Sequence, residues 1–443
     1  MKNTLSVENI QRDVLATIDE MREEIIQLAS NMVKIPSVNP NYDGVNKAEV
    51  IGGEKNVQLF LKPIFEGICD EVDMWEVEEH RPNLVGRMKG SGNGGKSLIF
   101  NGHIDVVPPG PNSDWKFNDP FSGRVEDGRL YGRGACDMKG GIAAQIMAAK
   151  ALKKLGVQLK GDLLLETVVG EETMDHELGV TATVERGYTA DAAIVSEPSG
   201  PPQSLAVVPV SPGVIRMHIT VKGKTTHASV RREFIRAGGK HGEVGINAVE
   251  KGMYIVQALQ QLEDEWGFTK KHELFEPGHF SIHPGIIHGK SYDVDLPFVV
   301  SDYCTIQYAV WHHPKETFEE VKAEILGHVE RAVQNDLWLR INPPEVEFLL
   351  HWPAFDVAVD HPIVQATSRA HKEATGEEAT IHGFVAVADA AFLNAKGIPS
   401  IIYGPGSILV AHAANEYVLV EDLIKAAKTY ALTAIDWCGI EGL

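Results

Sequence analysis

Cysteine is scarce in this chain: four of its 443 residues are cysteines. They stand apart at Cys69, Cys136, Cys304 and Cys438, with no CxxC pair and no other short spacing. This distribution argues against a disulfide-stapled scaffold and against a zinc site built from cysteine thiolates.

A long apolar run is also missing. No stretch reaches the roughly 18 consecutive apolar residues that a membrane-spanning helix requires. The first 37 residues read as one acidic amphipathic helix, without the apolar core of a secretory signal. We therefore expect a soluble, cytoplasmic protein with no membrane partner.

Basic residues are outnumbered by acidic ones. The chain has 41 Lys and Arg against 61 Asp and Glu, and its formal net charge is −20. Nucleic acids and anionic membranes attract clustered positive charge, so neither is an expected partner. The acidity is typical of a solubilising surface, and it excludes partners without naming a substrate.

The first half of the chain alternates short apolar runs with helical stretches, which predicts an α/β domain. We expect buried strands in residues 83–88, 97–107, 162–170 and 191–199, and one more strand in 398–406. Helices are expected over 138–156 and 421–438. The fold class is therefore α/β, with a mostly parallel sheet flanked by helices.

The middle of the chain has a different order of elements. Strand-like and helical segments follow one another there as βαββαβ, which indicates a small inserted α+β domain. We expect a discontinuous catalytic domain, residues 1–212 and 353–443, and an inserted domain, residues 213–352.

Potential metal ligands stand at the ends of several predicted strands. His103 and Asp105 close one strand, Glu171 and Glu172 another, and Glu197 a third. Asp137 precedes a helix, and His412 follows the last strand. Because functional crevices of open α/β sheets lie at the carboxyl ends of strands, these side chains are expected to converge. Any one of them alone is more often structural, but five at consecutive strand ends indicate a site.

Charge balance favours metal at this site. Asp137, Glu172 and Glu197 gathered in one pocket would repel each other, and their pKa values would rise. Two divalent ions remove that repulsion. Two histidines with carboxylates suit zinc, with cobalt or manganese as substitutes.

The motifs around these residues resemble those of the M20 metallopeptidase family. This group includes aminoacylases, acetylornithine deacetylases, succinyl-diaminopimelate desuccinylases and carboxypeptidases G. The similar segments run in family order: NGHIDVVP, DPFSGRVEDGRLYGRGACDMKGG, GEET, SEPS, VKGKTTHAS and AHAANEYV. They span about 315 residues, and the inserted domain falls where the family has its lid and dimerisation domain.

The resemblance implies a role for each candidate. His103, Asp137 and Glu197 would bind one metal ion, and Asp137, Glu172 and His412 the other. Asp105 would orient His103. Glu171 would carry a proton from the attacking water to the leaving nitrogen. The family also holds the peptide bond after the shared aspartate in cis, here Asp137–Met138.

The lid carries further candidates. The resemblance implies that His227 stabilises the oxyanion in the partner's active site, and hence a homodimer. Many relatives grip a substrate carboxylate with an Arg on the lid strand that here reads TIQYAVWHHP, and this strand has none. One of three arginines in the following loop would bind the substrate instead: Arg231, Arg232 or Arg236. Otherwise the substrate lacks that carboxylate. An equal alternative is that these arginines only form a solvated basic loop.

The function expected is hydrolysis of an amide bond in a small N-acyl amine or amino acid, with an acetyl, formyl or succinyl group. An acyl or formyl amide of a small metabolite is expected, for example of a heterocyclic amine such as a formylaminopyrimidine, but the residues name neither the acyl group nor the amine. Alternatives are a dipeptidase or carboxypeptidase with the same site, and a non-catalytic binding protein, which would not need Glu171. The last alternative is a P-loop nucleotide triphosphatase, because residues 90–97, GSGNGGKS, match the nucleotide-binding loop pattern. A strand follows them, however, where that loop needs a helix.

Overall fold

The computed structural model describes residues 6–291 and 296–443, which form two compact units. The first comprises residues 1–210, 357–384 and 388–443; the second comprises 211–356 and 385–387. The first five residues, which belong to the N-terminal helix expected from the sequence, lie outside the described part. The mixed α/β class and the βαββαβ order of the insertion are confirmed.

The first unit is built on a large sheet whose strands run in the order β1-β2-β6-β3-β7-β15-β8, with β14 also paired to β8. Its central pairs are parallel: β6 with β3, β3 with β7, and β7 with β15. Every residue of β3, β6 and β7 is buried, as expected for a parallel sheet covered on both faces. The strands are β1 (Glu71–Glu76), β2 (Pro82–Met88), β3 (Leu98–His103), β6 (Leu163–Val168), β7 (Ala192–Val195), β8 (Val207–Ser211), β14 (Ile381–Gly383) and β15 (Ser400–Ile402).

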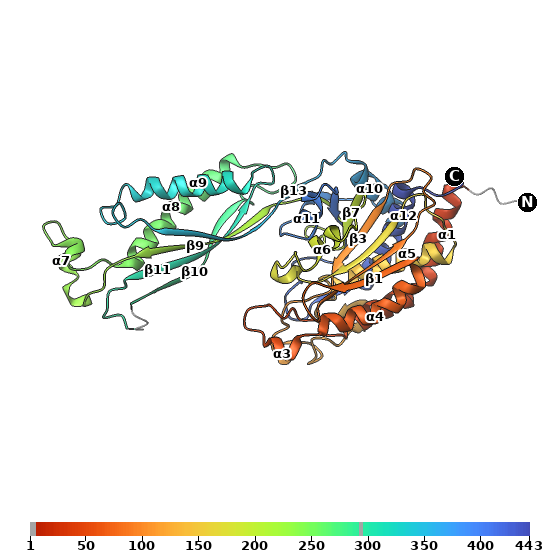
Figure 1. Ribbon diagram of the computed structural model, residues 1–443, viewed down its shortest axis with the longest axis horizontal. Coiled ribbons are helices and arrows are strands. Elements are labelled where there is room, and N and C mark those ends of the chain that lie inside the picture. The colour runs from red at the N-terminus through yellow and green to blue at the C-terminus, as the bar shows by residue number, and fades with distance from the viewer. Residues whose placement is uncertain (1–5, 292–295) are drawn as a thin grey trace, which may run out of the picture. The chain divides into compact units, whose positions relative to one another are not determined.

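Helices cover both faces of this sheet (Figure 1). Neighbouring strand residues point to opposite faces, and β3 shows the consequence. Gly102 faces α5, and a Cβ there would lie 2.6 Å from Ile142. Asn101 faces the other side, where Glu166 binds it and Thr183 of α6. The helices of this unit are α1 (Val7–Glu20), α2 (Arg22–Val33), α3 (Lys47–Val50), α4 (Gly53–Ile68), α5 (Lys139–Lys154), α6 (Val180–Glu185), α10 (Pro362–Thr375), α11 (Ala390–Ala395) and α12 (Val420–Cys438).

The N-terminal segment differs from the expected single helix. It forms two helices, α1 and α2, because Met21 leaves the helical backbone region with φ −84° and ψ 6°. Each helix buries its own apolar side, with Ile18 in the first and Ile25 in the second. A small sheet of β4 (Arg124–Glu126), β5 (Arg129–Tyr131) and β16 (Tyr417–Leu419) completes the unit.

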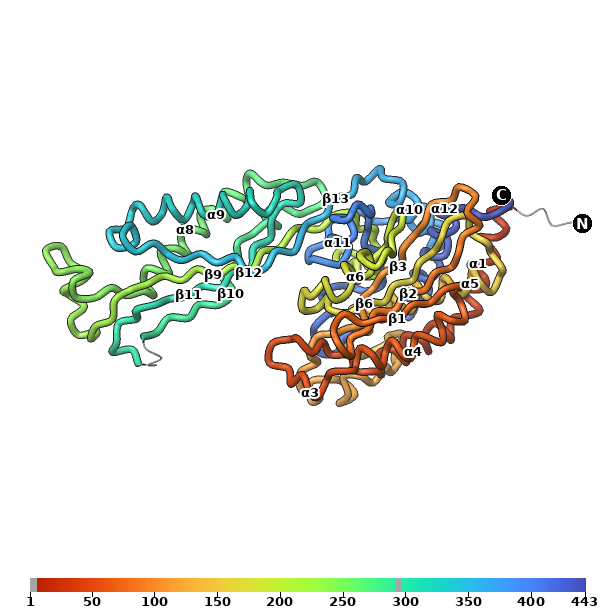
Figure 2. The backbone as a smooth tube through the Cα atoms, viewed as in Figure 1, coloured from red at the N-terminus to blue at the C-terminus, as the bar shows by residue number. Residues whose placement is uncertain are grey.

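The second unit is an antiparallel sheet with the order β10-β11-β9-β12, and α8 and α9 pack side by side along it (Figure 2). Buried residues alternate along β9, from Ile215 to Val221, so one face of the sheet meets the helices. The elements are β9 (Gly213–Lys222), α7 (Arg232–Ile235), α8 (Ala248–Thr269), β10 (Ser281–Lys290), β11 (Tyr303–His312), α9 (Phe318–Val333) and β12 (Glu345–Trp352), after which β13 (Phe355–Asp356) leads out of the unit.

Residues 90–97 form a turn between β2 and β3, as expected, and the backbone N–H groups of Gly90, Ser91 and Gly92 donate to the protein's own oxygens. In the described ranges, no helix combines the length and apolar character needed to cross a bilayer.

Candidate metal centre

Histidine and carboxylate side chains from separate elements meet at the carboxyl end of the large sheet. His103 is the last residue of β3, which lies in parallel register with β6, so that His103 is opposite Val168. Glu171 and Glu172 follow β6 in a short 3-10 turn (Glu171–Thr173). Gly170 opens this turn with φ +92°, a conformation that favours glycine, and a Cβ there would lie 2.6 Å from the Asp175 carbonyl oxygen.

One set of contacts centres on His103. Its Nε2 lies 3.1 Å from Asp137 Oδ1 and 3.4 Å from Glu197 Oε1. Glu171 Oε2 is farther from the same nitrogen, at 3.8 Å. Three carboxylates therefore surround His103 Nε2, and two overlapping groups could hold a metal ion: His103 with Asp137 and Glu172, and His103 with Glu171 and Glu197.

A second set centres on His412. Its Nε2 lies 3.2 Å from Asp137 Oδ2 and 3.1 Å from Glu172 Oε2. Asp137 therefore presents one oxygen to each histidine. Asp137, Glu172 and Glu197 are almost wholly enclosed, whereas His412 is half-exposed. The Asp137–Met138 peptide bond is cis, as the family resemblance implies.

The donor atoms fit divalent cations. Oε1 of Glu172 and Oε1 of Glu197 are buried, and neither accepts a hydrogen bond from any residue that the structure describes. A buried carboxylate oxygen without a donor is costly, and a cation would satisfy it. His103 Nδ1 lies 2.9 Å from the carbonyl oxygen of Asp105, which can only accept. Nδ1 therefore carries a hydrogen, and Nε2 is the ring nitrogen that faces the carboxylates and would bind a metal ion.

The pKa values of the metal-free cluster reflect this crowding. Burial raises the pKa of Glu197 to about 8, and burial also raises the pKa of Glu172 above its ordinary value. Burial opposes protonation of His412, but its hydrogen bonds to Asp137 and Glu172 raise its pKa to about 11. In Asp137, the bonds from the two histidines outweigh burial and lower the pKa. The cluster without metal therefore holds protons in place of cations.

Asp105 contacts His103 through its backbone carbonyl oxygen, and it contacts the turn after β6 through its carboxylate. Its carboxylate Oδ1 is 3.7 Å from His103 Nδ1, beyond hydrogen-bond distance, so the carbonyl oxygen makes the contact instead. The carboxylate accepts the backbone N–H groups of Gly170 and Glu172, at 3.0 and 3.1 Å, and the side chain of Asn39. Asp105 thus joins the strand that ends in His103 to the turn that carries Glu171.

Four of the predicted site residues belong to the second unit: His227, Arg231, Arg232 and Arg236. Each arginine forms an ion pair there, Arg231 with Glu250 and the other two with Glu233. Their role in substrate binding stays a prediction.

Other residues at the centre were not predicted from the sequence. Arg133 and Glu416 form a buried ion pair behind Asp137, and Asp389 is buried with one carboxylate oxygen unpaired among the described residues. Arg133 and Glu416 stand inside two motifs that the sequence singles out, but only the fold brings those motifs together.

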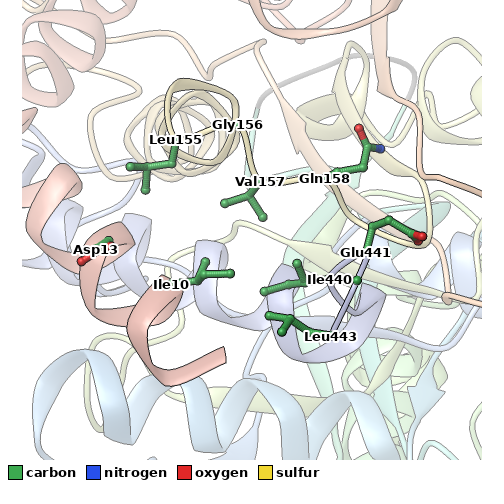
Figure 3. A pocket seen from close by; sticks show the side chains of 10 residues that line it. Ile10, Asp13, Leu155, Gly156, Val157, Gln158, Ile440, Glu441 and Leu443 are labelled. Carbon is green, nitrogen blue, oxygen red and sulfur yellow. The ribbon is translucent and has the colours of Figure 1, made fainter. Parts of the chain in front are cut away.

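The cavity of about 380 Å³ in Figure 3, lined by α1, residues 155–158 and residues 440–443, shares no residue with the cluster.

The chain is similar to a known family of peptidases and to two proteins described as deformylases. The model of peptidase family M20/M25/M40 matches residues 99–436. An N-formyl-4-amino-5-aminomethyl-2-methylpyrimidine deformylase of Halalkalibacterium halodurans is 35% identical over 97% of this chain and 98% of its own length. The enzyme of the same description from Bacillus subtilis is 35% identical over 95% of this chain and 96% of its own.

Solved structures show the same fold at lower identity. A tripeptidase from Staphylococcus aureus superposes with a TM-score of 0.70 at 19% identity, covering 94% of this chain and 98% of its own. The dipeptidase Dug1p from Saccharomyces cerevisiae gives 0.69 at 14% identity, with 97% and 98% covered. With a family model matched over most of its length and relatives at 35% identity, the chain belongs to peptidase family M20/M25/M40.

Proposed function

We propose that this protein is a two-metal amide hydrolase that removes the formyl group from an N-formyl aminomethylpyrimidine. The observation that carries the hydrolase is the sharing of Asp137 between His103 and His412, with Glu171 beside them. His103, Asp137 and Glu197 would hold one ion, and Asp137, Glu172 and His412 the other. When bound, two such ions supply Lewis-acid polarisation of the substrate carbonyl and lower the pKa of the attacking water.

Glu171 is suited to move the proton in this reaction. Its side chain is mostly enclosed, and burial raises its pKa well above the ordinary value in the metal-free protein. Water adds to the formyl carbon, and the carbon–nitrogen bond breaks to give formate and a free amine. The Glu171 carboxylate accepts the proton of the water and delivers it to the departing nitrogen.

The substrate class is supported by the relatives and by the lid strand. Two relatives that match nearly the whole chain are described as deformylases of the formylated aminomethylpyrimidine. The strand β11 carries no arginine to bind a substrate carboxylate, and this pyrimidine has no carboxylate to bind. The description of the relatives and the absence of arginine from β11 of this chain thus point to the same substrate class.

We also propose zinc as the metal, a homodimer, and a cytoplasmic location. Two histidines with carboxylates suit zinc, and four buried free cysteines agree with a reducing compartment. In His227, Nδ1 accepts the N–H of Ser229 at 3.2 Å, so Nε2 carries the hydrogen. Nε2–H could then donate to the developing oxyanion in a partner's site. Metal analysis and sedimentation of the purified protein test the first two points.

A substrate panel tests the proposed function. The zinc-loaded enzyme is incubated with the N-formyl aminomethylpyrimidine, the N-acetyl and N-succinyl forms of the same amine, and a set of dipeptides. The proposal predicts formate release with the highest kcat/KM for the formyl compound. Faster hydrolysis of dipeptides would instead identify a peptidase, and no turnover of any amide would contradict the hydrolase.

A further inference from the structure

A buried ion pair connects the two loops that carry metal ligands. Arg133 lies in the loop between β5 and α5, four residues before Asp137, and Glu416 lies four residues after His412. The two side chains are enclosed, and Arg133 Nη1 binds Glu416 Oε2 directly. Placing a charged pair in the interior has a desolvation cost, which hydrogen bonds must offset. Both Nη atoms of Arg133 make such bonds, whereas its Nε has no partner among the described residues.

Each partner also holds the backbone next to a ligand. Glu416 Oε1 accepts the N–H of Cys136 at 2.9 Å and the N–H of Asp137 at 3.1 Å. Arg133 Nη2 donates to the carbonyl oxygen of His412 at 3.0 Å, and Nη1 donates to that of Ala413 at 3.3 Å. The pair therefore fixes the separation of Asp137 and His412.

The two ligand sets depend on this pair to different degrees. His103 ends β3 and Glu197 follows β7 by two residues, so the paired strands of the sheet position both. His412 is in a loop, half-exposed, with a left-handed φ of +61°. Asp137 is also in a loop. The set of Asp137, Glu172 and His412 thus has two ligands whose backbone is held by Arg133 and Glu416.

We propose that Arg133 and Glu416 are positioning residues that set the metal affinity of the site formed by Asp137, Glu172 and His412. The site of His103, Asp137 and Glu197 depends on them less. This inference rests on the two-metal centre of the proposed function. It adds that the two sites are held by different features. The paired strands of the sheet position His103 and Glu197, whereas the buried ion pair positions Asp137 and His412.

Zinc binding to the full-length chain tests this inference. Zn²⁺ is titrated against a chromogenic chelator, and the zinc content is measured after dialysis, for the wild type and for Glu416→Gln. The substitution keeps the side-chain size but leaves Arg133 without its counter-charge. We expect one of two zinc ions to bind about 10–100-fold more weakly, the range typical for groups that hold a ligand in place. The other ion should be retained.

Two further variants separate positioning from stability. Arg133→Lys keeps the charge beside Glu416 but cannot make the whole set of bonds to Glu416, His412 and Ala413, and it should weaken the same ion. Leu61→Ala truncates a buried residue of α4, and it should lower the melting temperature while both zinc constants stay unchanged.

Three results would overturn the inference. Unchanged zinc constants in Glu416→Gln and Arg133→Lys would do so, as would equal weakening of both ions, because an equal loss is what a general structural role predicts. A wild type that binds no zinc would contradict the proposed metal centre itself. This outcome is distinguishable from the first two, because it is seen in the wild type before any variant is compared.

Discussion

The Asp105 carboxylate accepts the backbone N–H of Glu172 at 3.1 Å. The N–H of Gly170 donates to the same carboxylate. The two bonds attach the turn that carries Glu171 and Glu172 to the end of β3. The Asp105 side chain thereby sets the position of Glu171 relative to His103.

Asp105→Asn should therefore weaken catalysis through the turn. The amide has a single acceptor oxygen in place of two, and its NH₂ group repels the N–H that it would face. We expect kcat/KM to fall by about 10–100-fold, with weaker zinc binding. The check is steady-state kinetics together with zinc titration. Full activity in Asp105→Asn would show that the turn is held without this carboxylate.

Removal of metal should destabilise the protein as well as inactivate it. Glu172 and Glu197 then lose the cations that offset their burial, and the native state loses the free energy of binding, about 4 kcal/mol when free metal is 1,000 times its dissociation constant. We expect chelation to lower the melting temperature and readdition of Zn²⁺ to restore it. Equal melting temperatures with and without chelator would contradict the assignment of these carboxylates as ligands.

Glu166 gives a prediction about stability and pH. Burial raises its pKa from 4.5 to about 7. The folded state thus keeps a proton that the unfolded chain releases above pH 4.5, and stability falls as the pH rises through this window. Glu166→Gln resembles the neutral form. Its free energy of unfolding should exceed that of the wild type by up to roughly 3 kcal/mol at pH 7, and by little near pH 4.5.

Urea unfolding of both proteins from pH 4.5 to 8 measures this difference. The exposed Glu373 of α10 provides a matched control, because Glu373→Gln should show no such trend. A constant difference between Glu166→Gln and the wild type across the range would mean that Glu166 is ionised in the folded state.

Much of the fold followed from the sequence because its local patterns agree with its tertiary structure. Apolar runs without alternation predicted the buried parallel strands β3, β6 and β7, and the βαββαβ order predicted the second unit. Both are confirmed, as is membership of the M20 family. The break at Met21 was missed, because the amphipathic pattern continues through it.

The candidate site was predicted in part, for a physical reason. The carboxyl ends of parallel strands lie at one edge of the sheet, so their positions in the chain predicted that the five candidates would meet, and the structure brings them together: His103, Asp137, Glu172, Glu197 and His412. The Arg133–Glu416 pair joins residues 283 positions apart. Periodicity carries no signal for such a pairing. The use of the Asp105 carbonyl, in place of its carboxylate, is likewise a matter of three-dimensional geometry.

Replacement of Glu171 by Gln tests whether this residue moves the proton in a two-metal amide hydrolase. The variant and the wild type are loaded with zinc, and formate release from the N-formyl aminomethylpyrimidine is measured beside zinc content, with Glu177→Gln, an exposed position in the next loop, as the matched control. We expect two zinc ions in all three proteins, and a kcat lower by about 10²–10⁴-fold in Glu171→Gln alone. A Glu171→Gln enzyme that binds both ions and keeps the wild-type kcat would contradict this role.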